Sequence, residues 1–321
     1  MLTRYCFDIH YIGKNYGGWI NTFNKDSSYH IKNKPGITDY LFKAFQKFAG
    51  PENVSNLRGS SRTDAGVSAL CNRFHVDIAM RTKTRYNVNK DLANILPYDA
   101  ETIRKAVNYY MNADDVVITD GRIVDKTTFD AVRSARSRTY MYRILCRASA
   151  KNDVLFRFHE DNLWRVEHDL DVERMRDAAQ HLLGTHDFTS VRNAGCSCST
   201  ATRTVQRLDI SEVQISDQSL LHQEATLLGE GKLLIIHIKA NAFLYRMVRN
   251  IVGALVDVGK GKLSPDDLPN LISNKDRHAL PPPAPAQGLY LMHVEYDEEK
   301  DWILNSKKQT INSSRDLRAK D

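Results

Sequence analysis

The sequence has no run of about eighteen apolar residues, the length that a helix needs to cross a bilayer. Its first residues alternate, with Tyr5, Phe7, Ile9 and Tyr11 separated by other side chains, and this pattern predicts a strand rather than a signal sequence. We therefore expect a soluble protein. Its 321 residues suit one large domain or two modest ones.

Cysteine is scarce and does not suggest disulfide pairing. There are five cysteines, an odd number dispersed along the chain, which indicates reduced thiols in an intracellular compartment. The close pair Cys196-Ser197-Cys198 lacks a second ligand pair at zinc-finger spacing. Glycine-rich phosphate loops are also missing. We expect no metal ion and no small-molecule cofactor.

Acidic residues are missing from one stretch of the chain. The segment from Ala131 to Arg147 carries five arginines and no Asp or Glu, although the net charge of the whole chain is only +6. Between Arg58 and Arg85, six cations are balanced by only two acids. This placement indicates a basic face for a polyanion such as nucleic acid. Two arginine-rich, solvated strands are the alternative from charge alone.

Signals for both kinds of secondary structure are present. Alternation or β-branched residues predict strands at residues 5–12, 74–78, 116–119, 139–146, 205–210, 233–239 and 289–296. Helical spacing with glycine or proline at the ends predicts helices at residues 38–48, 89–96, 171–183, 243–258 and 266–272. Strands and helices without strict alternation indicate an α+β fold with mainly antiparallel sheets.

One polar turn is typical of a catalytic site. The segment Arg62-Thr63-Asp64-Ala65-Gly66 places a carboxylate between a cation and a glycine. The preceding Arg58-Gly59-Ser60-Ser61 has no apolar side chain, so neither segment fills a core. Gly66 lets the backbone adopt a positive φ or approach another chain closely. Asp64 is therefore the main candidate for chemistry.

The predicted helix at residues 243–258 is apolar on most faces and must be largely buried. Arg249 lies in its middle, and a buried arginine needs an acidic partner because it stays charged. The alternative is an arginine at the edge of the helix, with its stem on apolar surface and its head in water.

Tyr140 and Tyr142 alternate with other residues on a predicted strand, so both face the same side. Core packing is the default for such a pair. In a cleft, a tyrosine ring would instead offer a surface on which a nucleic-acid base stacks.

Three motifs follow one another along the chain. They are Ser60-Ser61-Arg62-Thr63-Asp64-Ala65-Gly66-Val67, Arg138-Thr139-Tyr140-Met141-Tyr142-Arg143 and Phe243-Leu244-Tyr245-Arg246-Met247-Val248-Arg249-Asn250-Ile251-Val252-Gly253. In content and order they resemble the TruA family of tRNA pseudouridine synthases, and weaker echoes extend the resemblance from about Tyr5 to Tyr296. Variants such as Ser60-Ser61-Arg62 resemble the metazoan tRNA pseudouridine synthase-like 1 branch.

The resemblance implies two ferredoxin-like or RNP-like halves, with mixed, mainly antiparallel sheets flanking a basic active-site cleft. We expect an N-terminal domain at residues 1–120, a C-terminal domain at 121–297 and a charged, disordered tail at 298–321. The resemblance implies tRNA as the partner and no association with a membrane. The family suggests a homodimer, and the branch suggests mitochondria, with cytoplasm and nucleus left open.

The resemblance also implies roles for individual residues. Asp64 would be the catalytic carboxylate, Arg249 would pair with it and hold it ionised, and Tyr140 would be the active-site tyrosine. Tyr142 is a substrate-binding candidate or a support for Tyr140. Arg62 would fill the stack that an extruded nucleotide leaves, or contact phosphate without that role. Phosphate contacts are further expected from Arg58, Arg133, Arg136 and Arg138.

Pseudouridine formation breaks the bond between uridine N1 and C1′, rotates the base and rejoins it through C5. A single carboxylate serves all these steps, through a covalent adduct at C1′ or through an elimination, and the sequence leaves both routes open. The nucleotide must be extruded from its stem, because the sugar carbon is shielded there.

Two other functions stay open at this stage. One is a catalytically silent RNA-binding protein that retains the fold, which the intact Asp64, Tyr140 and Arg249 disfavour. The other is a hydrolase that frees uracil. Ser68 stands where the family usually has His, and Ile20 where it has Gln. These departures leave the target RNA and the target uridine open.

Overall fold

The structure of the protein, a computed structural model, describes residues 2–20, 34–79, 97–146, 161–193, 195–196, 198–215 and 231–297. The chain divides into two compact units. Unit 1 comprises residues 1–65, 69–136 and 294–321, and unit 2 comprises residues 66–68 and 137–293. This division differs from the predicted boundary near residue 120, because the strand at Val116–Val124 pairs with the first strand of the chain and belongs to unit 1.

Unit 1 has the element order βαββαβ. The elements are β1 (Leu2–Tyr11), α1 (Ile37–Ala49), β2 (Val54–Gly59), β3 (Ser68–Ala79), α2 (Ala100–Met111) and β4 (Val116–Val124). In the sheet β1 lies between β4 and β3, β2 also pairs with β3, and all three pairings are antiparallel. This order and pairing are those of a ferredoxin-like unit.

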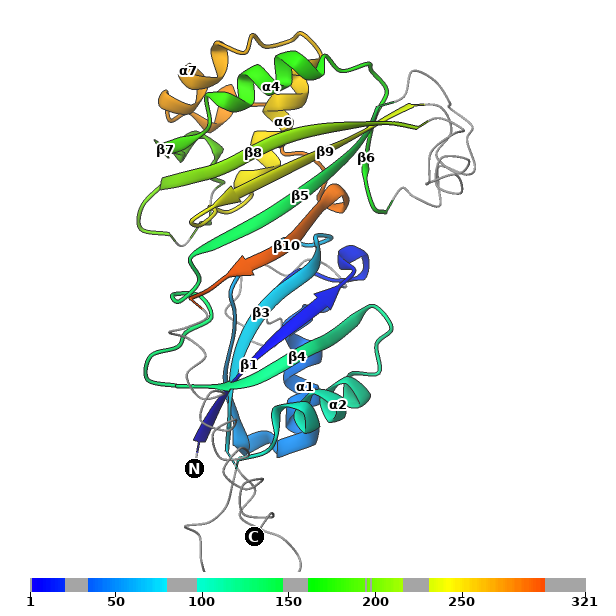
Figure 1. Cartoon of the computed structure of the whole chain (residues 1–321), viewed down its shortest axis with the longest axis vertical. Coiled ribbons are helices and arrows are strands. Elements are labelled where there is room, and N and C mark those ends of the chain that lie inside the picture. Colours follow the sequence, from blue (N-terminus) through cyan, green and yellow to red (C-terminus); the bar gives the residue numbers. More distant parts are fainter. Residues whose placement is uncertain are drawn as a thin grey trace, which may run out of the picture. The chain divides into compact units, whose positions relative to one another are not determined.

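The core of unit 1 forms where alternate side chains of β1 meet the helices. Tyr5, Phe7 and Ile9 are buried, and the ring of Phe7 lies 5.8 Å from Phe45 of α1 and 5.6 Å from Phe74 of β3. Helices α1 and α2 pack together beside this sheet (Figure 1). The predicted alternation in the first strand is thus confirmed, and it defines the face that the helices cover.

Unit 2 repeats this order with small additions. Its elements are β5 (Ser137–Cys146), β6 (Trp164–Val166), α4 (Val172–Gln180), β7 (Gly184–Asp187), β8 (Thr202–Ile215), β9 (Gly231–Ala240), α6 (Met247–Gly259), α7 (Asp267–Ser273) and β10 (Leu289–Glu295). Strand β9 is antiparallel to both β5 and β8, β10 lies beside β5, and β6 is parallel to β5. Helices α4, α6 and α7 gather on one side of these strands (Figure 1).

The predicted α+β class is confirmed, and so is each predicted strand, with shifts at its ends. Helices are found near four of the five predicted positions, while the predicted helix at 89–96 and the tail at 298–321 lie outside the described residues. The sequence reading missed α2, β2, β6 and β7. The shared cleft stays a prediction, and each unit is described below by itself.

Candidate active site

The turn that carries Asp64 connects β2 to β3 and spans residues 60–67. Arg62 is exposed, whereas Asp64 is half-buried. Gly66 has a φ of 81°, in the left-handed region that favours glycine. The predicted conformational role of Gly66 is therefore confirmed. The carboxylate is held on a short connection between two paired strands.

Buried polar side chains of β1 and β3 form hydrogen bonds to this turn. Asn72 of β3 is fully buried, and its Oδ1 accepts a hydrogen bond of 2.8 Å from the hydroxyl of Ser60. The Asn72 Nδ2 donates to the carbonyl of Ser61 at 3.1 Å and to the hydroxyl of Tyr11 at 3.3 Å. The Tyr11 hydroxyl in turn shares a 2.8 Å hydrogen bond with the hydroxyl of Thr63. Ser60, Ser61 and Thr63, which precede Asp64, are thus fixed by the amide of Asn72 and the hydroxyl of Tyr11.

A second support comes from the loop after β1. The backbone N–H of Trp19 donates to the carbonyl of Thr63 at 3.0 Å. Gly18 has a φ of 91°, and a Cβ there would lie 2.4 Å from that same carbonyl oxygen. Gly59 lies under the Trp19 ring, where a Cβ would be only 2.3 Å away. Both glycines permit close approaches that hold the turn.

Sequence reasoning missed the roles of Tyr11 and Asn72. Tyr11 was recognised only as an apolar member of an alternating strand, and Asn72 was not singled out. The one available signal was an amide side chain inside the strand that follows the catalytic motif. Its meaning depends on contacts with residues far along the chain, and these appear only in the fold.

In unit 2, Arg249 lies in the first turn of α6, because this helix begins at Met247. The predicted position of Arg249 in the middle of the helix is therefore wrong. Its Nε donates to the carbonyl of Ala284 at 2.7 Å, and the Ala284 N–H donates to the carbonyl of Arg249 at 2.9 Å. A Cβ at Gly253 would lie 2.6 Å from the carbonyl oxygen of Pro282. Helix α6 and residues 282–284 therefore touch backbone to backbone.

The two tyrosines of β5 differ in their surroundings. Tyr142 is 1 % exposed, its hydroxyl donates to the carbonyl of Pro285 at 2.7 Å, and its burial raises its pKa. Its ring packs within the unit, as expected of a support for Tyr140, and a contact of Tyr142 with the substrate stays a prediction. Tyr140 is 7 % exposed and meets Phe243 edge to face at 5.0 Å between ring centroids.

Asp64 belongs to unit 1, whereas Arg249 and Tyr140 belong to unit 2. The ion pair between Asp64 and Arg249 therefore stays a prediction. What the structure does show is how the turn that carries Asp64 is supported in unit 1, and which groups Arg249 and Tyr140 contact in unit 2.

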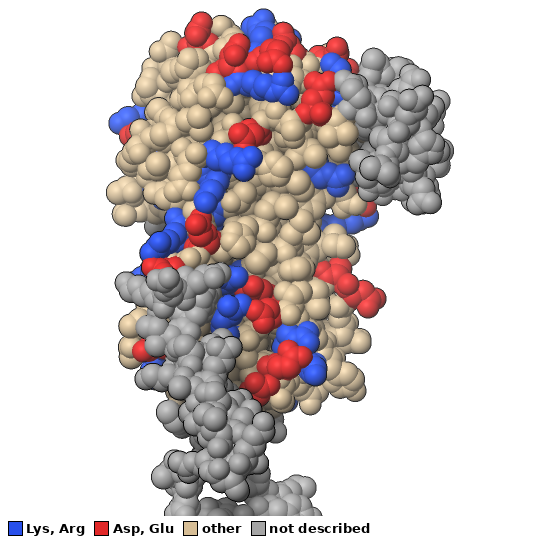
Figure 2. All heavy atoms as spheres, viewed as in Figure 1, with Lys and Arg blue, Asp and Glu red and all other residues tan. Residues whose placement is uncertain are grey.

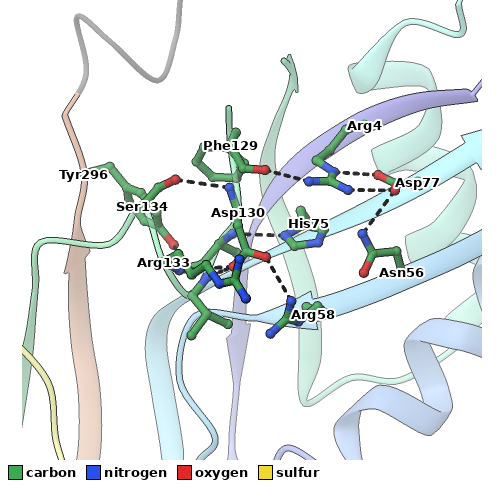
Figure 3. Close-up of polar contacts among 12 residues, drawn as sticks. Arg4, Asn56, Arg58, His75, Asp77, Phe129, Asp130, Arg133, Ser134 and Tyr296 are labelled. Atoms are coloured by element: carbon green, nitrogen blue, oxygen red, sulfur yellow. Dashed lines mark hydrogen bonds and ion pairs between the residues drawn. The ribbon is translucent and has the colours of Figure 1, made fainter. Parts of the chain in front are cut away.

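Arg58 is held by an acidic group at the start of a loop. The Asp130 carboxylate accepts from Arg58 Nη1 at 3.0 Å and from the backbone N–H groups of Val132 and Arg133 at 2.9 and 3.1 Å (Figure 3). Partial burial opposes ionisation of Asp130, but the backbone donors of Arg133 and Val132 and the charge of Arg58 lower its pKa. The loop that carries Arg133 is thus ordered by an ionised carboxylate.

The arginines of the acid-free stretch are not equivalent. Arg133 and Arg136 are exposed, and Arg136 forms an ion pair with Asp297. Arg138 is only 7 % exposed, and its Nη1 donates to the carbonyl of Asn241 at 3.0 Å. Arg138 is thus mostly enclosed while the other two are open to solvent, and the expectation that all three contact phosphate stays a prediction. Figure 2 shows basic and acidic side chains interspersed on the visible face of each unit.

Within the described ranges, no three His, Cys, Asp or Glu side chains gather as metal ligands would. No helix in that part of the chain is long and apolar enough to cross a membrane.

Comparison with known proteins adds the family. Residues 178–297 match the family model described as tRNA pseudouridine synthase. The chain is 34 % identical over 297 residues to the tRNA pseudouridine synthase A of Sinorhizobium fredii, covering 92 % of this chain and 100 % of that protein. The proteins of the same name from Roseobacter denitrificans and Agrobacterium fabrum are each 32 % identical, with 92 % of this chain and 96 % and 94 % of the relatives covered. Together with the turn at Asp64 and the two ferredoxin-like units, these matches show that the chain belongs to the TruA family of tRNA pseudouridine synthases.

Proposed function

We propose that this protein isomerises specific uridines of tRNA to pseudouridine, with Asp64 as the catalytic carboxylate. One observation carries the proposal most directly. A single carboxylate lies on a turn that a buried network holds in place, in a chain of the tRNA pseudouridine synthase family. A preorganised group is what a reaction with several steps at one carbon requires.

The reaction needs no external reactant. Asp64 assists cleavage of the bond between N1 and C1′, either by attacking C1′ or by taking part in an elimination. The freed uracil turns within the site and forms a bond from C5 to C1′. The proton on C5 is then lost to solvent and N1 gains a proton, so atoms and electrons balance.

Arg249 supports Asp64 in this proposal by keeping the carboxylate ionised, since an arginine stays charged throughout. The hydrogen bond from Arg249 Nε to the Ala284 carbonyl fixes the stem of the guanidinium. Tyr140 is proposed to contact the extruded base or its sugar. Arg62, which is exposed beside the turn, would contact phosphate or fill the vacated stack.

The substrate would be gripped mainly through its backbone. Exposed Arg133 and Arg136, with half-exposed Arg58, are the proposed phosphate contacts in unit 1. Stems of RNA are recognised by shape and phosphates, whereas sequence is read at unstacked positions. These arginines would therefore contribute affinity for tRNA in general rather than for one uridine.

The motif variants support a finer assignment to the metazoan tRNA pseudouridine synthase-like 1 branch. That assignment brings a mitochondrial location as a further proposal, and the resemblance to the family as a whole brings a homodimer. They rest on the resemblance of motifs such as Ser60-Ser61-Arg62, and fractionation of cells and sedimentation of the pure protein test them.

Product analysis tests the proposed activity. Transcribed tRNA carrying tritium at C5 of uridine is incubated with the protein, digested to nucleosides and separated. We expect tritium release together with pseudouridine at one or a few positions. Free uracil would instead indicate a hydrolase, and binding without any change in the RNA would indicate a silent RNA-binding protein.

A further inference from the structure

Arg246 and Arg277 both lie at the beginning of helix α6, the turn that also carries Arg249, and neither has a role assigned above. Arg246 immediately precedes the helix and has φ 60° and ψ 11°, a left-handed conformation that is uncommon for a residue with a side chain. Such backbone strain is concentrated at functional sites. Its guanidinium carbon lies 5.1 Å from the centroid of the Tyr245 ring.

Arg277 reaches the same place from a different segment of unit 2. Its Nη2 donates to the Oδ1 of Asn250 at 3.0 Å, and its Nη1 donates to the carbonyl of Leu280 at 3.1 Å. Asn250 is fully buried and is itself fixed, because its Nδ2 donates to the carbonyl of Val191 at 2.7 Å. The guanidinium of Arg277 is therefore held by two hydrogen bonds, and no acidic side chain among the described residues pairs with it.

The two arginines are brought to the same turn of the helix, Arg246 as the residue before it and Arg277 through its bond to Asn250. Burial lowers the pKa of Arg277, and the charge of Arg246 lowers it further. Among the described residues, neither arginine forms an ion pair with an acidic side chain. The helix adds to this positive charge, because the N-terminal end of α6 carries a partial positive charge of its own.

Most of the hydrogen-bond donors at this place are unused within the described part of the chain. Two guanidinium groups offer ten N–H donors between them, by the five-donor count for arginine. Arg277 uses two of them and the Arg246 side chain uses none. The Nε of each arginine is enclosed and has no acceptor among these residues. Paired cations with free donors and no carboxylate fit an oxyanion.

We propose that Arg246 and Arg277 form a binding site for a phosphate group of the substrate RNA. The planar fork of arginine matches phosphate geometry, and two such forks at a helix N-terminus combine direct hydrogen bonds with charge. The site deepens the proposed function and rests on it, since RNA is the polyanion that the protein would handle. It would hold the substrate on unit 2, separately from the arginines of unit 1.

Filter binding of tRNA across a salt series tests the site. Each lost phosphate contact lowers the slope of log affinity against log salt by about 0.7 to 0.9, and weakens binding roughly fivefold at 0.1 M salt. We expect this loss for Arg246→Gln and for Arg277→Gln, whereas Arg277→Lys keeps the slope because it keeps the charge. The matched control is Arg176→Gln, since Arg176 is already paired with Glu173.

Unchanged slopes in both glutamine variants would overturn the proposal, as would an equal loss in the control. Arg277→Gln also removes two internal hydrogen bonds, so the melting temperature of this variant is measured as a control for folding. Arg246→Gln breaks no side-chain hydrogen bond to any residue that the structure describes, so it keeps the test valid if the other variant unfolds. If the glutamine variants lower the salt slope but the wild-type protein forms no pseudouridine, the proposed function is refuted and the phosphate site still stands.

Discussion

The hydroxyl of Tyr11 bonds to the turn that carries Asp64, while its ring is buried in unit 1. Tyr11→Phe therefore removes the bonds to Thr63 and Asn72 and leaves the packing intact. We expect unfolding to become easier by about 1 kcal/mol. We also expect kcat to fall severalfold with KM unchanged, because a small displacement of the carboxylate affects the transition state more than binding.

The control for this variant is Tyr5→Phe on the same strand. The Tyr5 hydroxyl also donates to a backbone carbonyl, that of Tyr98, at 2.9 Å, but it lies away from the turn. Similar losses of melting temperature with a fall of kcat only in Tyr11→Phe support a positioning role. Equal kcat values in the two variants would contradict it.

His75 makes the stability of unit 1 depend on pH. It is fully buried, and its Nδ1 accepts a hydrogen bond of 3.0 Å from the backbone N–H of Ala131 (Figure 3). Burial, aided by the charge of Arg4, lowers its pKa from 6.5 to about 4. The unfolded chain therefore binds a proton near pH 6.5 that the folded protein accepts only near pH 4.

Neutral His75 contributes its full share of the free energy of unfolding above pH 6.5. As the pH falls towards 4, the free energy of unfolding decreases by roughly 3 kcal/mol. The nearby Asp77 and Asp130 have pKa values below 3.8, so they titrate at lower pH. Denaturant titrations at several pH values measure the effect. His75→Asn retains an acceptor for Ala131 but does not titrate, and its stability should change less over this range. Parallel curves for both proteins would refute the assignment.

At the residue scale, the sequence predicted what is local. Asp64, its basic neighbour and the positive φ of Gly66 follow from one short segment. Tyr11 and Asn72 lie 61 residues apart, and their shared role arises only when β1 and β3 pair. Arg138 was grouped with its neighbours by charge, because burial of one arginine on a strand leaves no compositional signal.

Helix α6 is placed by a backbone contact that only glycine allows. A Cβ at Gly253 would lie 2.6 Å from the Pro282 carbonyl oxygen, so Gly253→Ala must displace residues 282–284. Ala284 of that segment holds the guanidinium of Arg249. We expect a loss of stability of about 1 to 3 kcal/mol and a clear fall in turnover.

Gly261→Ala separates this contact from simple backbone strain. No atom of the described residues lies within 4 Å of a Cβ there, and φ is 72°, so the change adds only the strain of a left-handed residue. This variant should lose about 1 kcal/mol and keep its turnover. Melting curves and turnover of both proteins are compared, and a Gly253→Ala protein that behaves as wild type would contradict the account of α6.

At the element scale, periodicity located the strands and most helices but not all their ends. The apolar pattern continues through Phe243 and Leu244, so the helix was expected to begin there, whereas the left-handed Arg246 delays it to Met247. Helix α2 was missed because its buried stripe is narrow and the rest of its surface is polar. Strand β2 alternates poorly and takes its conformation from pairing with β3.

The two units share the order βαββαβ and the same strand pairing, although the sequence shows no internal repeat. Different apolar sequences can form the same unit of helices packed on a sheet, so two such units need not resemble each other in sequence. The duplication was therefore expected from the family resemblance and not from the residues themselves. The division between units likewise depends on which distant strands pair.

The acid-free arginine stretch gives a prediction about how the whole protein holds RNA. Arg133→Gln removes an exposed cation, so the salt slope of tRNA binding should fall by about 0.7 to 0.9. Arg138→Gln removes an enclosed group that bonds to Asn241, so it should lower the melting temperature and leave the slope unchanged. Filter binding and melting curves of the two variants decide this. If instead Arg138→Gln lowers the slope and Arg133→Gln lowers only the melting temperature, burial does not distinguish the roles of these two arginines.

The central claim is that Asp64 carries the isomerisation, and one comparison tests it most directly. Wild-type protein and Asp64→Asn are incubated with tRNA labelled with tritium at C5 of uridine, and released tritium is counted while binding is measured in parallel. The account predicts release and pseudouridine with the wild type, and no release with Asp64→Asn, whose affinity for the RNA stays within several-fold because the phosphate contacts are kept. Release by Asp64→Asn at more than roughly a tenth of the wild-type rate would contradict the account, since loss of a catalytic carboxylate costs far more.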